Sequence, residues 1–404
     1  MDHVQRYFLT LLSCSLTGGV PPAPEAFSPA DWEVLFRLAR EQKLLPLIFE
    51  ALCRSPQGKS LPRFPELKRE VISQVMLQAR KTAELHRVLD ALTAAGLQPL
   101  VVKGAVCRGL YPQGDHRPSS DEDVLIPPEQ SAECHRILTG LGFFTETDPA
   151  SGDYEIPYRQ KNGPLYIELH RSLFSPKSDA YGGLNRFFAG AHERAVTVTA
   201  GSRAIPTLEH TDHLFYLICH AFKHFLHSGF GLRQVCDAVL FAKAYESRIN
   251  WPQLLDSCRA IRADRFAAAL FRIGETHLSL SPVPGIFRDI PADPEPMLKD
   301  LLAGGIYGSA TPSRRHSSNI TLDAAAGTGT GGKAGALLAS LFPPAKKLEN
   351  RHPWLKGKPW LLPAAWISRA AGYLKESSSD NSAAEALKIG RERVELLKYY
   401  HILP

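Results

Sequence analysis

Residues 117–130 read RPSSDEDVLIPPEQ, a run of acidic residues that leads directly into apolar ones. The apolar run after Asp123 predicts a buried strand. Carboxylates are rarely buried without a partner, so either this acidic end is exposed or a cation lies beside it. Side chains alternate between the two faces of a strand, which places Asp121 and Asp123 on one face and Glu122 on the other. Two carboxylates at this spacing can share a divalent cation such as Mg²⁺, which prefers oxygen ligands.

An Asp-x-Asp sequence alone also fits an exposed acidic turn that Ser119 or Ser120 caps. Two further features favour a metal–nucleotide site. Glu168 in YIELH lies on another predicted strand, and a third acid would complete a two-metal site. Upstream, VVKG ends a strand and Gly104 opens a helix, whose N–H groups would face a triphosphate with Lys103 as a charge partner.

The rest of the chain predicts helices on both sides of a small sheet. Helical spacing of apolar residues dominates before and after a stretch in which short strands and helices alternate. We expect an α+β fold in which a small mixed-sheet domain is flanked by N-terminal and C-terminal helical regions. The expected parts are a helical region over residues 1–96, an α/β core over 97–205, a helical domain over 206–303, a flexible Gly/Ser/Thr-rich linker over 304–335 and a basic helical segment over 336–404.

Composition indicates an ordinary globular protein. The formal net charge is +6, and the segment from Leu341 onward holds 11 Lys/Arg against 6 Asp/Glu, so it carries most of the excess. This excess fits an anionic partner, but a solvated basic face is the better interpretation. Seven scattered cysteines fit a reducing compartment, and no apolar run is long enough for a membrane span. The N-terminal YFLTLLSCSLTGGV fits an amphipathic helix better than a signal peptide, and we expect a cytoplasmic protein.

Three segments follow one another along the chain: VVKGAVCRGLYP, then an arginine shortly before SDEDVLI, then YIELHRSLF. In this order they resemble the uncharacterised nucleotidyltransferase family of the DNA polymerase beta-like superfamily. Similarity extends to HLFYLICHAFKHF, LRQVCDAVLFA and the closing RVELLKYY, so it covers most of the chain. The resemblance implies a nucleotidyltransferase fold and transfer of a nucleoside monophosphate from a nucleoside triphosphate such as ATP, with release of pyrophosphate.

By position, the resemblance implies that Asp121, Asp123 and Glu168 bind two Mg²⁺ ions and that Glu168 also helps to deprotonate the acceptor hydroxyl. The implied nucleotide contacts are Lys103, Gly104, Arg117, His224 and Arg233. Lys103 stands where the wider superfamily has a second small residue, which distinguishes the phosphate contact of this family. The acceptor is unknown, and a small molecule, a protein and an RNA end all remain open.

Several residues leave alternatives open. Arg117 fits either a phosphate contact or an ion pair with Asp115. His213, His220, His224 and His227 share one face of a predicted helix, where packing, a zinc site or substrate contact would each explain them. On the next predicted helix, we expect Arg233 and Asp237 to form an ion pair.

The segment GTGTGGKAG (327–335) has the spacing of a phosphate-binding loop, but Ala334 replaces the Ser or Thr that would hold Mg²⁺. A flexible linker is the better interpretation of this segment. Two functions other than nucleotidyl transfer also remain open for the chain. One is an Asp-x-Asp glycosyltransferase, and the other is a non-catalytic nucleotide-binding or interaction protein on the same fold.

Overall fold

The computed structural model describes most of the chain up to Gly305 and shorter pieces beyond it. The described residues are 1–55, 58, 61, 63–201, 203–227, 229–280, 284–305, 321, 354, 358–365 and 382–403. Most of the predicted linker and the whole of the GTGTGGKAG segment lie outside them. Within them, helices flank a mixed sheet, and the predicted α+β fold is confirmed.

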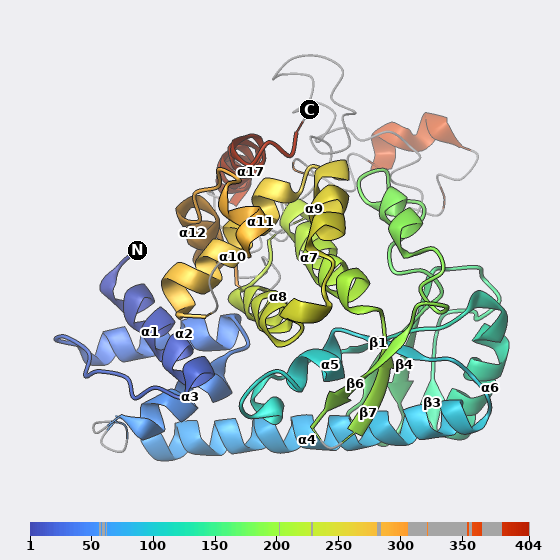
Figure 1. The fold of residues 1–404 in the computed structure, drawn as a ribbon, viewed down its shortest axis with the longest axis horizontal. Coiled ribbons are helices and arrows are strands. Elements are labelled where there is room, and N and C mark those ends of the chain that lie inside the picture. The colour runs from blue at the N-terminus through green and yellow to red at the C-terminus, as the bar shows by residue number, and fades with distance from the viewer. Residues whose placement is uncertain are drawn as a thin grey trace.

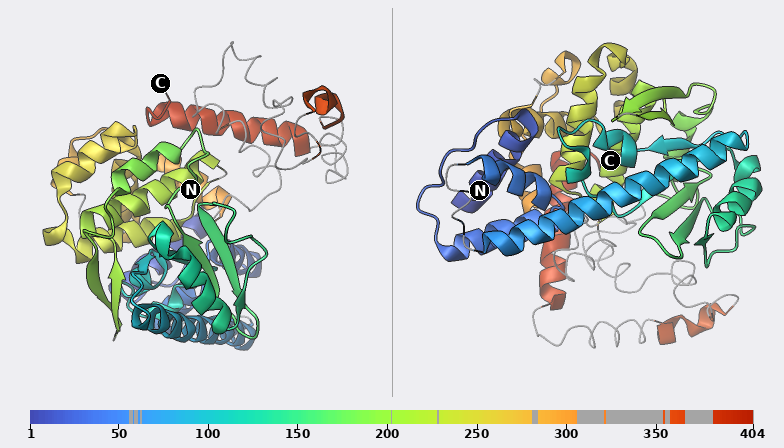
Figure 2. Two further views of the ribbon diagram at one scale, coloured as in Figure 1. Left: turned by 90° about the vertical axis from the view of Figure 1, so that its right-hand side faces the viewer. Right: turned by 90° about the horizontal axis from the view of Figure 1, so that it is seen from below.

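In the described residues before the sheet there are four α-helices: α1 (His3–Thr17), α2 (Pro29–Glu41), α3 (Leu45–Arg54) and α4 (Phe64–Ala94). Ser28 caps α2 through the N–H of Asp31, whose side chain in turn accepts the N–H of Ser28. The 31 residues of α4 form one helix along the lower edge of the molecule, beneath both the N-terminal helices and the sheet (Figures 1 and 2). This helix therefore connects the N-terminal region to the sheet.

The sheet has five strands in the order β1-β2-β5-β4-β3. Their bounds are β1 Leu100–Val102, β2 Glu122–Leu125, β3 Phe143–Phe144, β4 Glu155–Gln160 and β5 Tyr166–His170. The pair β2–β5 is parallel and the other pairs are antiparallel. Two short helices connect strands, α5 (Gly104–Arg108) after β1 and α6 (Ser131–Gly140) after β2. The strands predicted at VV, DEDVLI and YIELH are therefore confirmed.

Four strands have no counterpart in the expected elements. Pro157 interrupts the pattern of β4, because proline lacks the N–H that an interior strand position uses. A hairpin of β6 (Val196–Ala200) and β7 (Arg203–Thr207) forms a second sheet, and β7 packs against β1. The alternating Val and Thr residues of VTVT are the signal for this hairpin.

The described chain is helical again after β7. Its α-helices there are α7 (His210–His227), α8 (Leu232–Ala244), α9 (Trp251–Ala260), α10 (Asp264–Leu278), α11 (Gly285–Arg288), α12 (Glu295–Gly304) and α17 (Ser382–Tyr399). Within α17, the buried Arg393 binds Asp300 of α12 at 2.7 Å, so the end of the chain is attached to the helices above the sheet. Among the described residues, the main hydrophobic core includes buried side chains from Val4 to Ile402, and Ala365 belongs to a separate small cluster.

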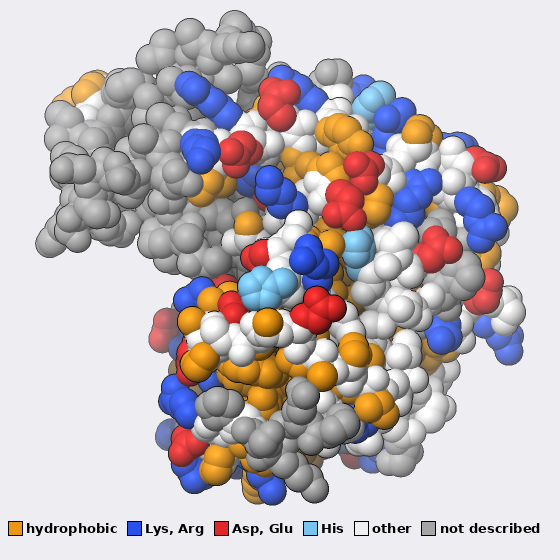
Figure 3. All heavy atoms as spheres, turned by 90° about the vertical axis from the view of Figure 1, so that its left-hand side faces the viewer, with side chains coloured by type: hydrophobic (Ala, Val, Ile, Leu, Met, Phe, Trp, Pro, Cys, Tyr) orange, Lys and Arg blue, Asp and Glu red, His pale blue; other side chains and the backbone are white. Residues whose placement is uncertain are grey.

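The surface does not separate charges by sign on the face that Figure 3 shows. There, Lys and Arg side chains are interspersed with Asp and Glu side chains. The positive net charge of the chain therefore forms no single basic field on this face. Among the described helices, none combines the length and apolar character that crossing a membrane requires.

Candidate active site

The parallel pairing of β2 and β5 gathers acidic side chains at one place. Asp123 is opposite Glu168 in the register of the two strands, so both side chains lie on the same face. His170 is two residues after Glu168 on β5, so its side chain lies on the same face as Asp123 and Glu168. One potential ligand atom from each of Asp123, Glu168 and His170 lies within 4.8 Å of the other two, which makes these three a candidate metal-binding group among the described residues.

Asp123 is almost fully buried and has a basic group on each side. Its Oδ1 lies 3.0 Å from His170 Nε2, and its Oδ2 lies 2.8 Å from Lys103 Nζ. Burial opposes ionisation of this carboxyl, but the Lys103 ammonium and the hydrogen bond from His170 outweigh it and hold the pKa of Asp123 well below its usual range. Asp123 is therefore a carboxylate, and Lys103 is its counter-ion.

Glu168 lacks such compensation. Burial and the negative charges of Asp123, Asp121 and Glu155 raise the pKa of Glu168 to about 8, although Lys103 opposes the shift. The cluster thus contains more carboxylate than one lysine neutralises. In addition, His170 Nδ1 is buried without a hydrogen-bond partner, and it lies 3.9 Å from Glu155 Oε2. Oxygen ligands with an excess of negative charge fit a hard divalent cation.

The turn between β1 and α5 is strained and is held by α7. Lys103 has a φ of +57°, which a residue with a side chain rarely adopts. Its N–H donates to His213 Nε2 at 3.1 Å. Thr207 Oγ1 donates to Val101 O at 2.6 Å and so accepts from His213 Nδ1 at 2.9 Å. His213 is therefore neutral, and burial lowers its pKa to about 3.

Glu122 lies on the other face of β2, as strand alternation predicts, and supports the turn from behind. It accepts hydrogen bonds from Arg108 at 2.5 Å, from the Ser119 hydroxyl at 2.7 Å and from the Ala105 N–H at 3.1 Å. The N–H groups of Lys103 and Ala105 thus have acceptors within the protein, and α5 has only five residues. The Lys103 ammonium, rather than a helix N-terminus, is therefore the positive group that this turn places beside Asp123.

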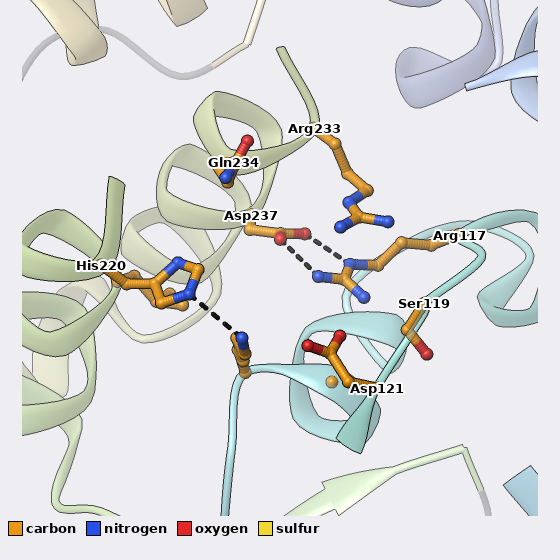
Figure 4. A pocket seen from close by; sticks show the side chains of 10 residues that line it. Arg117, Ser119, Asp121, His220, Arg233, Gln234 and Asp237 are labelled. Carbon is orange, nitrogen blue, oxygen red and sulfur yellow. Dashed lines mark hydrogen bonds and ion pairs between the residues drawn. The ribbon is translucent and has the colours of Figure 1, made fainter. Parts of the chain in front are cut away.

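A narrow cavity, here called the central cavity, opens beside the acidic cluster (Figure 4). Its walls come from the end of β1, the loop before β2, and helices α7 and α8. They are formed by Lys103, Gly104, Arg117, Ser119, Asp121, Leu217, His220, Arg233, Gln234 and Asp237. The open volume is about 20 Å³, enough for about one water molecule. A larger ligand therefore requires some of these side chains to move.

Arg117 lines this cavity and forms an ion pair that the sequence did not predict. Its Nε and Nη2 donate to the two oxygens of Asp237 at 2.7 and 2.5 Å, and both residues are buried. The expected Arg233–Asp237 pair is wrong, because Asp237 turns to Arg117 and Arg233 donates to the Pro118 carbonyl. The alternative pair of Arg117 with Asp115 is also not formed. Residues 117–121 are thus tied to α8.

The histidine face of α7 points toward the acidic cluster. His220 Nε2 lies 3.1 Å from Lys103 Nζ, and His224 Nε2 lies 3.3 Å from His220 Nε2. His220 lines the central cavity, whereas His224 lies behind it and does not line it. The Lys103 ammonium occupies the position next to His220 where a zinc ion would have to bind, so the zinc interpretation is not supported.

The sequence analysis predicted Asp121, Asp123 and Glu168 as metal ligands but did not identify His170 as part of the site. The structure puts Asp123 and Glu168 in the tight group, while Asp121 lines the adjoining cavity. His170 carried a usable signal, because it follows Glu168 by two residues on the same predicted strand and therefore shares its face.

Comparison with known proteins decides the family. Residues 28–278 match a family model described as uncharacterised nucleotidyltransferase, and this match spans more than half of the chain. The chain belongs to the uncharacterised nucleotidyltransferase family. None of the curated proteins matches it.

Among solved structures, two proteins are similar to this nucleotidyltransferase over about half of its length. The antibiotic-resistance factor ANT(2'')-Ia has 13% identity and a TM-score of 0.33, over 49% of this chain and 95% of that one. An antigenic nucleotidyltransferase-like protein from Paracoccidioides brasiliensis has 9% identity and a TM-score of 0.31, over 52% of this chain and 96% of that one.

Gly104→Ala should destabilise this nucleotidyltransferase. A Cβ on Gly104 would lie 2.1 Å from Glu122 Oε2, and Glu122 cannot move without losing its three hydrogen bonds. We expect a loss of about 1–3 kcal/mol in the free energy of unfolding, measured by denaturant titration. Gly140→Ala in α6 is the matched control, because nothing lies within 4 Å of its Cβ, and it should leave stability unchanged or raised. Equal stability of the two variants would contradict this account.

His213→Leu tests the neutral histidine behind the Lys103 turn. At pH 8 the variant should be less stable than wild type, because two buried hydrogen bonds are lost. The folded-state pKa of His213 is about 3 and its unfolded value is near 6.5, so wild type loses stability as pH falls below about 6.5 while the variant lacks this loss. The difference in unfolding free energy should shrink by up to about 1.4 kcal/mol per pH unit between pH 6 and pH 4. If the difference in unfolding free energy between wild type and His213→Leu stays constant between pH 6 and pH 4, His213 is not held neutral in the folded protein, which would contradict this account.

Proposed function

We propose that the protein is a metal-dependent nucleotidyltransferase that transfers a nucleoside monophosphate from a nucleoside triphosphate, ATP among them, to a hydroxyl acceptor. The observation that carries this proposal is the grouping of Asp123 with Glu168, beside Asp121, at the edge of a cavity lined with basic side chains. Membership of the family supports the reaction class.

Asp121, Asp123 and Glu168 are the residues that would hold Mg²⁺. Their carboxylate oxygens match the ligands that Mg²⁺ prefers. Burial and the neighbouring negative charges together raise the pKa of Glu168, and a cation would neutralise those charges. When bound, the metal supplies neutralisation of the charge on the phosphates and on the departing pyrophosphate. His170 donates to Asp123 and orients it, as a partner behind a metal ligand commonly does.

The basic side chains of the central cavity would bind the triphosphate. Lys103 reaches the cavity from β1, and we expect its ammonium to exchange Asp123 for a phosphate oxygen. Arg117 is held by Asp237 through two of its nitrogens, so its third nitrogen, Nη1, remains for a phosphate. Gly104 and Arg233 line the same cavity. His224 does not line it, so its effect on the nucleotide would be to position His220, which it contacts.

In the proposed reaction, the acceptor hydroxyl oxygen forms a bond to the α-phosphorus. The bond between that phosphorus and the oxygen bridging to the β-phosphate breaks, and pyrophosphate leaves with the bonding electrons. The hydroxyl proton would pass to a carboxylate oxygen of Glu168, the role that the family resemblance implies for this residue. The protein contributes mainly position and charge.

Asp123→Asn tests the metal and nucleotide assignment. Wild type should gain stability with ATP or another nucleoside triphosphate only when Mg²⁺ is present, by about 2.7 kcal/mol at a ligand concentration of 100 times Kd. Asp123→Asn removes a buried anionic ligand and should lose this gain, measured as a shift in Tm. The matched control is Asp256→Asn, which changes the same charge on an exposed part of α9.

Three outcomes would count against the proposal. Metal-dependent stabilisation that Asp123→Asn retains would remove Asp123 from the site. Stabilisation of wild type without any pyrophosphate release, across a broad set of hydroxyl acceptors, would favour the non-catalytic nucleotide-binding protein. Stabilisation by nucleotide-sugars in place of nucleoside triphosphates would favour the glycosyltransferase.

A further inference from the structure

A second cavity, here called the α4 pocket, adjoins the central cavity. It lies between the α2–α3 turn, one face of α4, the loop before β2 and Arg233 of α8, and its volume is about 380 Å³. Pockets of this size accommodate small-molecule ligands. Ser119 and Arg233 line both cavities, so they form a shared wall, and Asp121 follows directly after this wall.

The α4 pocket has an excess of positive charge. Lys43, Lys81 and Arg233 line it together with the pair Arg40–Glu70. Glu70 is neutralised by Arg40, which donates to its two oxygens at 2.9 and 2.7 Å. Burial lowers the pKa of Lys81, the charges of Glu122 and Asp121 oppose this shift, and the nearby charge of Lys43 adds to it. An anion between the two lysines would relieve that repulsion.

The lining residues also indicate which ligands fit the pocket poorly. Its remaining residues are aliphatic or neutral polar, such as Leu45, Leu77 and Gln74, and no described aromatic side chain lines it. Nucleobases stack on aromatic rings in many binding sites. An anionic group therefore fits this pocket better than the base of the nucleotide does.

The shared wall is fixed from the pocket side. Lys81 Nζ donates to the Ser119 carbonyl at 2.8 Å, and the Ser119 N–H donates to Gln78 Oε1 at 2.8 Å. A ligand that contacts Lys81 would thus lie beside the loop that carries Asp121. This proximity is what an acceptor requires, because its hydroxyl must reach the nucleotide at the acidic cluster.

We propose that the α4 pocket binds the acceptor, and that the acceptor is a small hydroxyl compound with an anionic group, a phosphate or a carboxylate, held by Lys43, Lys81 and Arg233. This inference rests on the proposed nucleotidyl transfer and names the substrate class for it. The anionic group would anchor the molecule in the pocket, and its hydroxyl would extend past Ser119 toward Asp121.

Lys43→Gln is the test variant. Lys43 is exposed at the pocket rim, and its removal leaves the hydrogen bonds of the shared wall intact. The matched control is Lys68→Gln, which removes the same charge from an exposed position of α4 outside the pocket. The probes are inorganic phosphate, glycerol 3-phosphate, glycerate and glycerol, each measured by the shift in Tm at millimolar concentration, and Mg²⁺–ATP is measured separately with the same variants.

We expect glycerol 3-phosphate or glycerate to stabilise wild type and Lys68→Gln, and glycerol to have no effect. The affinity of Lys43→Gln for the anionic probe should fall roughly fivefold, which corresponds to about 1 kcal/mol for one exposed charge. Stabilisation by Mg²⁺–ATP should be retained. The comparison of glycerol 3-phosphate with glycerate identifies the anionic group.

Three results would overturn the proposal. One is equal binding of the anionic probes by Lys43→Gln and wild type, and another is the absence of stabilisation by any of these anions. The third is an equal loss of Mg²⁺–ATP binding, since the pocket would then belong to the nucleotide. Failure of Mg²⁺–ATP to stabilise wild type would instead count against the nucleotidyl transfer, and selective loss of anion binding in Lys43→Gln would still identify the ligand of the pocket.

Discussion

The parallel contact between β2 and β5 concentrates negative charge, and the surrounding structure compensates for it. Asp123 and Glu168 are neighbours in register, and Asp121 and Glu155 add charge close by. Lys103 offsets only part of this charge, so burial and the remaining charge keep the pKa of Glu168 raised. A protein that needed this cluster only for stability would gain by replacing one of its acids with an apolar residue. The retained excess is understandable if a cation and a phosphate complete the balance.

The elements around the cluster hold their positions through long-range contacts. His213 on α7 fixes the strained Lys103 turn, and Asp237 on α8 fixes Arg117. Both helices come after the sheet in the chain, and each contact crosses more than 100 residues of sequence. The helical region after the sheet is therefore part of the site, because it positions two basic residues against the acids.

Local sequence patterns were sufficient for the strands that carry the acids. Period-two alternation placed Asp121 and Asp123 on one face, and the same rule applied to Glu168 would have included His170. Ion-pair partners were harder to predict. The i, i+4 spacing of Arg233 and Asp237 suggested a pair within one helix, whereas Asp237 binds an arginine from another element. The α4 pocket was not predicted, since it depends on how four separate segments of the chain meet. Pro157 hid β4 for a different reason, because its missing N–H argues against an interior strand.

The continuity of α4 sets a limit on how its length can vary. Glu70, Gln74, Gln78 and Lys81 occupy one face of the helix and line the pocket, while further residues of the same helix pack under the sheet side of the molecule (Figure 2). Each residue inserted into an α-helix rotates the later part of the helix by about 100° and advances it by about 1.5 Å. A single insertion between Glu70 and Lys81 would therefore rotate one half of the pocket lining away from the other. Insertions of about seven residues, two helical turns, would restore the face but lengthen the distance from the N-terminal helices to the sheet, so relatives with the same pocket should keep the length of this helix.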